Sequence, residues 1–258
     1  MELLPTNAKS CLRLRLFVTL AVLGASALST VAQTAHQTQT FETSAGPVKI
    51  TPIFHASTLI EAGGKVIYVD PAKPSDFTGL PPADLILISD IHGDHMDPAA
   101  VAAVSKGGTE IIAPTAVAQT VTTAKKLANG EKTTWDKWSI EAVPMYNLVR
   151  GPEAGKLYHD KGRGNGYVLT YGGKRFYFSG DTENIPEMRA LKNIDVAFVC
   201  MNLPYTMTPE EAADGVLAFH PKLVIPYHYR QSDVGAFQKK LEGSGIEVRL
   251  LDWYPKKS

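Results

Sequence analysis

The chain has 258 residues and no net charge, because 26 Lys and Arg balance 26 Asp and Glu. Hydrophobic residues make up 44% of it and charged residues 20%, which excludes a disordered or fibrous chain and leaves a globular one. The balanced charge offers no basic field for phosphate backbones, so we expect no nucleic-acid binding.

The N-terminus has the pattern of a secretory signal peptide. Lys9, Arg13 and Arg15 precede an apolar run over residues 16–28, and small residues follow up to Ala32. The apolar run is shorter than the roughly 20 residues that a membrane span needs. We therefore expect cleavage after residue 32, no stable span afterwards, and a periplasmic or secreted protein. An uncleaved N-terminal anchor is the alternative.

The rest of the chain predicts one domain of mixed strands and helices. Residues 33–45, rich in Gln and Thr, predict a flexible tail, and the domain covers residues 46–258. Glycine pairs join the β-rich runs 58–62 and 65–70, and 166–171 and 174–178, which predicts two hairpins. Further strands are predicted over 48–50, 84–89, 110–113, 138–143, 195–200, 222–226 and 247–251, and helices over 97–104, 114–128, 208–219 and 232–241.

Polar residues are concentrated directly after the apolar strand over 84–89. Within a few residues the chain offers Asp90, His92, Asp94 and His95. The first two, spaced i and i+2, can meet one ion, and the next two can face a second ion. Imidazole nitrogen and carboxylate oxygen are ligands that Zn, Mn and Fe accept. The alternative is that these side chains cap the next helix and are solvated by water.

Two later strands also end in side chains that can bind a metal. The strand over 174–178 leads to Asp181, and the strand over 222–226 leads to His228. Rigid sites are commonly assembled from such strand ends. The sequence therefore predicts that these two residues join the earlier cluster in a divalent metal site.

These motifs resemble those of a known family. The run Asp90-Ile91-His92-Gly93-Asp94-His95, followed by Ser179-Gly180-Asp181-Thr182 and Pro226-Tyr227-His228, looks like that of the metallo-β-lactamase fold hydrolases. The branch that is most similar contains L-ascorbate-6-phosphate lactonase and N-acyl-phosphatidylethanolamine phospholipase D. The resemblance covers roughly residues 46–253. It implies an α+β fold, a four-layer αβ/βα sandwich with a metal site at one edge of the sheets.

The resemblance also implies a ligand set. His92, Asp94 and His95 match the family motif H-x-H-x-D-H, and Asp90 stands where its first His is expected. By the same resemblance, the carboxylate that bridges two metals is matched by Asp181, and the final His ligand by His228. The remaining family His should fall near residues 143–147, where we find Asn147 instead.

Both departures belong to one metal position, which has consequences for metal binding. Asn147 offers a neutral amide, a poor Zn ligand, and Asp90 replaces nitrogen by oxygen, which shifts preference toward Mn or Fe. We predict one or two divalent ions, Zn or else Mn or Fe. One is held firmly by Asp94, His95, Asp181 and His228, and the other is weaker or absent.

Two further histidines have open roles. His159 lies in a polar glycine-rich loop before a strand, and is either a substitute ligand or substrate contact, or an exposed loop histidine. His55 resembles an early family segment near the metals, and is either close to the ligands or a structural histidine.

Other side chains are candidates for contact with substrate. Tyr227, Tyr229 or Tyr146 could polarise the substrate or protonate its leaving group, although a tyrosine beside proline often only packs. Lys161 and Arg163 could bind an anionic substrate.

The resemblance implies an exported metal-dependent hydrolase with a small-molecule substrate. A metal-bound hydroxide would attack an ester, lactone, amide or phosphoester, and Asp94 would orient it and pass its proton. The alternative is a metal-binding protein with an altered, non-hydrolytic site. A β-lactamase is not expected, because those enzymes usually retain the His that Asn147 replaces. The sequence makes no prediction of oligomeric state.

Overall fold

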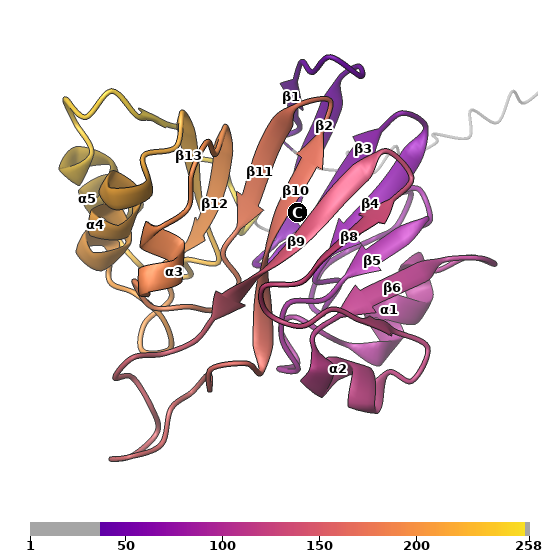
Figure 1. The fold of residues 1–258 in the computed structure, drawn as a ribbon, viewed down its shortest axis with the longest axis horizontal. Helices are drawn as coiled ribbons and strands as arrows, with labels where there is room; N and C mark the ends of the chain where they lie inside the picture. The colour runs from indigo at the N-terminus through magenta and orange to yellow at the C-terminus, as the bar shows by residue number, and fades with distance from the viewer. Residues whose placement is uncertain (1–36, 256–258) are drawn as a thin grey trace, which may run out of the picture. The chain divides into compact units, whose positions relative to one another are not determined.

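The structure is a computed structural model that describes residues 37–255. The predicted signal peptide, residues 1–32, lies outside the described residues, as does the start of the predicted tail. The described residues form two seven-stranded sheets with helices (Figure 1). Among the described helices, none is long and apolar enough to cross a membrane.

The first sheet combines an antiparallel and a parallel part. Antiparallel pairing joins the strands up to β4, and parallel pairing joins β4 to the strands that follow it. Its strand order is β1 (Gln39–Phe41), β2 (Val48–Phe54), β3 (Ser57–Ala62), β4 (Lys65–Val69), β5 (Leu85–Leu87), β6 (Glu110–Ala113) and β7 (Lys125–Lys126). The helices of this half are α1 (Pro98–Val104) and α2 (Thr115–Thr120).

The second sheet also has an antiparallel part and a parallel part. Its strands, in sequence order across the sheet, are β8 (Lys132–Trp135), β9 (Trp138–Met145), β10 (Gly164–Tyr171), β11 (Lys174–Phe178), β12 (Val196–Cys200), β13 (Leu223–Tyr227) and β14 (Glu247–Val248). The strands from β11 onward pair in parallel. The helices of this half are α3 (Pro186–Arg189), α4 (Pro209–Phe219) and α5 (Val234–Lys240).

Alternation along the strands explains the layers. In β3 and β4, Ile60 and Ile67 belong to the large apolar core that also contains residues of the second sheet. Their neighbours Leu59 and Tyr68 face the other way, into a smaller core with residues of α1 and α2. Successive side chains of a strand point to opposite faces, so this sheet buries both. Helices lie outside each sheet (Figure 1). The predicted four-layer αβ/βα sandwich is confirmed.

Both predicted hairpins are present. Tyr171 pairs with Lys174 across Gly172-Gly173, and β3 and β4 are joined in the same way by Gly63-Gly64. All four glycines have positive φ, between 50° and 82°. A two-residue turn whose twist matches the strands needs positive φ at both positions, which glycine adopts without steric cost.

The predicted flexible tail differs from the structure at its end. Residues 39–41 form β1, which pairs with β2. The ring of Phe41 is buried and lies 5.6 Å from that of Phe176, centroid to centroid. Burial of one aromatic side chain contributes about 1.5–3 kcal/mol, which favours an ordered strand over the composition-based expectation.

The helix predicted over residues 114–128 is shorter in the structure. The helix α2 ends at Thr120, and the chain then forms the short strand β7. Residues 120–123 are Thr-Val-Thr-Thr, and β-branched side chains lose rotamer freedom against the preceding turn of a helix. The end of the helix was predicted from Gly130, which lies beyond the residue where α2 ends.

Candidate metal centre

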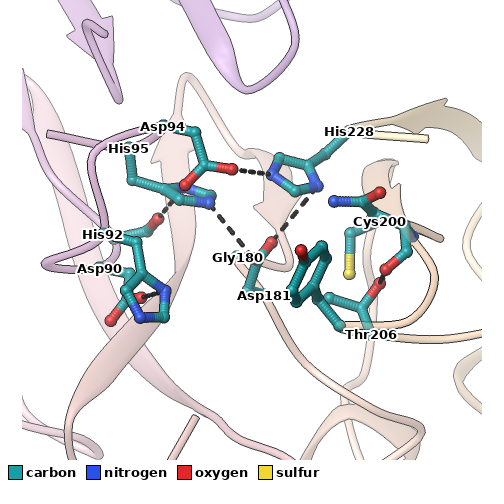
Figure 2. Close-up of polar contacts among 12 residues, drawn as sticks. Asp90, His92, Asp94, His95, Gly180, Asp181, Cys200, Thr206 and His228 are labelled. Carbon is teal, nitrogen blue, oxygen red and sulfur yellow. Dashed lines mark hydrogen bonds and ion pairs between the residues drawn. The ribbon is translucent and has the colours of Figure 1, made fainter. Parts of the chain in front are cut away.

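Loops after β5, β11 and β13 bring the predicted metal-binding side chains together. Three groups of side chains have ligand atoms within 4.8 Å of one another, and two of these groups share His228. They are Asp90, His92 and His159; His95, Asp181 and His228; and His55, Asp94 and His228. All six predicted ligands therefore lie in one cluster, together with two histidines whose roles were open. Figure 2 shows Asp94 facing His228, and His95 facing Asp181.

Asp181 lies at the centre of the cluster. Its Oδ2 is 3.3 Å from Nε2 of His95 and 3.3 Å from Nε2 of His159. Its Oδ1 is 3.5 Å from Nδ1 of His228. One carboxylate thus faces three imidazoles, which is the arrangement expected of a ligand shared by two cations.

The cluster fits a divalent cation. Nε2 of His95, both ring nitrogens of His228 and Oδ1 of Asp181 are buried and have no hydrogen-bond partner within residues 37–255. Each unsatisfied buried polar atom costs about 1–3 kcal/mol. Burial lowers the pKa of His95, but the carboxylates of Asp181 and Asp70 outweigh it and hold that pKa well above its usual range. The site therefore favours positive charge here, which a cation can provide in place of a proton.

Asp70, at the end of β4, fixes the orientation of His95. Oδ2 of Asp70 is 2.8 Å from Nδ1 of His95. The backbone N–H and the hydroxyl of Ser89 also donate to this carboxylate, at 2.7 and 2.6 Å. The proton of His95 is thereby placed on Nδ1, which leaves Nε2 free to bind a cation. Asp70 was not predicted from the sequence as a site residue, although its position as the last, polar residue of a predicted strand was a signal.

Asn147 supports His159 and does not face the cluster. The backbone N–H and Nδ1 of His159 donate to Oδ1 of Asn147, at 2.8 and 2.7 Å. The amide of Asn147 donates in turn to Oε1 of Glu183, at 3.0 Å. The interpretation of Asn147 as a metal ligand therefore does not agree with the structure. His159 occupies that place instead, with Nε2 pointing toward Asp181.

The metal position that was predicted to be weaker or absent has three side chains that can bind an ion. That position is lined by two imidazoles, those of His92 and His159, and by the carboxylate of Asp90. Arg163 donates to both oxygens of Asp90, at 3.1 and 3.0 Å. Burial raises the pKa of Asp90, but the hydrogen bond from His92 and the charges of His95 and Arg163 lower it to about 2. Asp90 is thus a permanent anion.

His55 holds Asp94 in place. The backbone N–H of Arg230 donates to Oη of Tyr254 at 2.7 Å, and this hydroxyl lies 2.7 Å from Nδ1 of His55. Burial, helped by the charge of His228, lowers the pKa of His55 to about 4, so the ring is neutral at pH 7. The hydroxyl then donates to Nδ1, and Nε2 donates to Oδ2 of Asp94 at 3.2 Å.

The tyrosines considered from the sequence support other groups. Tyr227 is fully buried, and its hydroxyl accepts a hydrogen bond from the backbone N–H of Gly180 at 2.9 Å. Tyr146 donates to the carboxylate of Glu187 at 2.9 Å, and Tyr229 donates to a backbone carbonyl at 3.1 Å. Tyr227 therefore positions the turn before Asp181, and its burial keeps it away from a substrate.

We expect Gly180→Ala to lower the free energy of unfolding by about 1–3 kcal/mol and to reduce metal content. Gly180 has φ +60°, and a Cβ there would lie 2.6 Å from Sδ of Met145 and 3.0 Å from the carbonyl oxygen of Asn165. Urea denaturation and elemental analysis measure the two effects. Gly130→Ala is the control, because Gly130 has φ +83° but open space around it. Equal effects of the two variants on metal content would contradict the expectation.

Comparisons with known proteins agree with this geometry. The family model described as the beta-lactamase superfamily domain matches residues 49–228 of the chain. The chain belongs to this superfamily. It is 33% identical over 177 residues to a UPF0173 metal-dependent hydrolase from Deinococcus radiodurans, covering 65% of this chain and 76% of that protein. A UPF0173 relative from Pyrococcus abyssi is 29% identical over 223 residues, covering 79% and 96%.

A solved structure gives the same result. The crystal structure of a protein from Parabacteroides distasonis assigned as a metal-dependent hydrolase has 44% identity and a TM-score of 0.80. The match covers 84% of this chain and 99% of that chain. The protein is thus a metal-dependent hydrolase of the metallo-β-lactamase superfamily, and this part of the sequence-based prediction is confirmed.

For this hydrolase we expect Asn147→Ala to lower metal affinity at the position of His159 by about 10–100-fold, the usual cost of losing a residue that orients a ligand. Metal titration followed by calorimetry measures the loss, and metal held by His95 and His228 should remain. Asn129→Ala is the control, because that amide bonds to the backbone of Gly164 and to Asn165. Unchanged metal affinity in Asn147→Ala would exclude the positioning role.

Proposed function

We propose that this protein is an exported hydrolase that cleaves a small ester, lactone or phosphoester. The observation that carries the proposal is the central carboxylate of Asp181, which faces the imidazoles of His95, His159 and His228. The resemblance to the branch that contains L-ascorbate-6-phosphate lactonase supports the lactone and phosphoester classes.

The ion and the side chains of the site would have different roles in hydrolysis. When bound, a divalent ion supplies Lewis acidity, which polarises the reacting carbonyl or phosphoryl group and acidifies water. Asp94 is the residue placed to accept the proton, because its side chain is 31% exposed and lines two cavities. His55 fixes the rotamer of Asp94 through the hydrogen bond to Oδ2. The attacking water therefore meets an oriented acceptor.

The non-hydrolytic alternative loses its main support. It rested on the replacement of two family His residues, by Asp90 and by Asn147, which implied an altered site. His159 contributes its imidazole to the same group as Asp90 and His92, so three side chains are present there. The complete set favours hydrolysis over metal binding alone.

A substrate panel tests the proposal. Protein loaded separately with Zn, Mn and Fe is assayed against an aryl ester, a lactone and a phosphodiester. We expect turnover of at least one class, with loss of turnover after chelation and recovery on adding metal back. A folded, metal-loaded protein that turns over none of them would overturn the proposed function.

Export has its own test. The basic residues and the apolar run before residue 32 support it. N-terminal sequencing of protein from the extracytoplasmic fraction should find a chain that begins at Gln33. Recovery of the uncleaved chain in the cytoplasm would contradict export, and recovery of it in the membrane would support the anchor instead.

A further inference from the structure

A large cavity opens beside the candidate metal centre. Its volume is about 860 Å³, within the range of about 300–1,000 Å³ that small-molecule sites occupy. Asp94 and His55 belong to its wall and connect it to the cluster. The rest of the wall carries aromatic and aliphatic side chains, including Phe54, Leu203, Tyr205 and Tyr254.

A smaller hollow at the metal-binding side chains shares three lining residues with this cavity. It has a volume of about 420 Å³ and is lined by His92, His159 and Asp181, among others. Tyr205 and Arg230 line both spaces, as Asp94 does. A molecule whose reacting bond lies at the cluster and whose body fills the larger cavity must therefore pass Arg230.

The wall of the larger cavity carries unbalanced positive charge. Arg230 and Lys73 line it, and Asp94 is the only carboxylate among the described lining residues. The guanidinium of Arg230 is 3.6 Å from Oδ2 of Asp94 and half exposed, and Asp94 is already shared with His55 and His228. The side chain of Lys73 is 67% exposed, and its ammonium lies 4.0 Å from Oδ1 of Asp97. Both cations are available to a ligand.

The cations that the sequence singled out are less available. Arg163 forms a two-pronged pair with Asp90, and Lys161 pairs with Glu187 at 2.6 Å. Neither residue is among those that line the larger cavity. Charge complementarity therefore points to Arg230 and Lys73, which line the larger cavity, and not to the cations that the sequence singled out.

We propose that the larger cavity binds the uncleaved part of the substrate, and that this part is an organic anion with an aromatic or aliphatic body. The inference rests on the proposed function, because it assigns the substrate class of the same site. The planar fork of Arg230 matches a carboxylate or phosphate, and Phe54 and Tyr254 offer faces for the body.

A third contact supports an organic ligand. Asn202 lines the cavity and is buried, and its Oδ1 has no hydrogen-bond partner among the described residues. An N–H or O–H group of the ligand would satisfy that oxygen. The bound molecule would then carry an anionic group for Arg230 and a donor for Asn202.

Direct binding of matched probes tests the inference without requiring turnover. Phenylacetate, benzylphosphonate and the neutral phenylacetamide share one aromatic body and differ in charge. Their affinities are measured by calorimetry with the full-length protein as purified and after chelation. The variants are Arg230→Gln, Lys73→Gln and the control Lys222→Gln, whose lysine pairs with Asp195 away from the cavity.

We expect at least one anion to bind about tenfold more tightly than the amide, as one charge-assisted contact provides. The preference should persist after chelation, disappear in Arg230→Gln, weaken in Lys73→Gln and survive in Lys222→Gln. Comparison of the two anions shows whether the site takes a carboxylate or a phosphonate.

Two results would overturn the inference. One is equal binding of the amide and both anions. The other is anion binding that is lost on chelation and unaffected by Arg230→Gln, because the anion would then bind only the metal. Turnover of the substrate panel without any anion preference refutes the inference and leaves the proposed function standing. Anion preference without turnover of any substrate supports the anion site and refutes the proposed hydrolysis.

Discussion

Asp181→Asn should lose most of its bound metal and nearly all turnover, the largest functional effect of any single substitution in this protein. Oδ2 of Asp181 is equidistant from His95 and His159, at 3.3 Å, and Oδ1 faces His228. Asparagine keeps the size of the side chain but removes its charge, so both groups of imidazoles lose the anion they share. The decrease in metal affinity should exceed the loss of about 10–100-fold that follows mutation of a residue that only orients a ligand.

Elemental analysis of protein purified without chelator, together with steady-state kinetics, measures this effect. Asp214→Asn is the matched control, because that exposed carboxylate pairs with Arg189 and contacts no member of the cluster. Circular dichroism establishes that both variants are folded. Full metal content in Asp181→Asn would mean that the remaining side chains suffice, and the shared-ligand role would be wrong.

Asp70→Ala should have the largest effect on stability, lowering the free energy of unfolding by about 3–5 kcal/mol, as loss of one partner of a buried charged pair does. The carboxylate is fully buried and accepts from the backbone N–H of Ser89, its hydroxyl and Nδ1 of His95. Alanine leaves the backbone N–H of Ser89 without an acceptor, and Nδ1 of His95 keeps only the hydroxyl of Ser89, 3.0 Å away. His95 also loses the group that orients its ring, so metal affinity should fall as well.

Urea denaturation of the metal-free protein isolates the effect on stability from the effect of metal binding. Asp84→Ala provides the comparison, because Asp84 is partly exposed, accepts from the backbone N–H of Val66 and pairs with Lys106. We expect a loss there of about 1–2 kcal/mol. If the two alanine variants were equally stable, the buried network around His95 would not be a major source of stability.

Much of the fold was predictable because its signals are local. Apolar runs such as residues 196–200 form strands that are buried along their whole length. Thr208 begins α4 with a capping box, in which its hydroxyl accepts from the backbone N–H of Glu211 and that carboxylate accepts from the backbone N–H of Thr208. The helix predicted over 114–128 was wrong in length, because the glycine that seemed to end it belongs to a later turn.

The site was predictable where its residues follow strands in a compact motif. His92, Asp94 and His95 lie within four residues of one another, and Asp181 and His228 follow apolar strands. His159 lies in a loop, and its direction is set by two hydrogen bonds to Asn147, twelve residues earlier in the chain. Asp70 reaches His95 only because β4 and β5 are neighbours. Such contacts depend on tertiary structure, which local patterns do not contain.

The cluster also joins parts of the molecule that belong to different sheets. Residues 90–95 follow β5 of the first sheet, whereas Asp181 and His228 follow β11 and β13 of the second. A bound ion would therefore link the two halves, because the side chains that would hold it come from both sheets. Folding stability should then increase with metal concentration, by about 2.7 kcal/mol at a hundred times the dissociation constant. The concentration of the ion would then affect the folding stability of the protein as well as its hydrolytic activity.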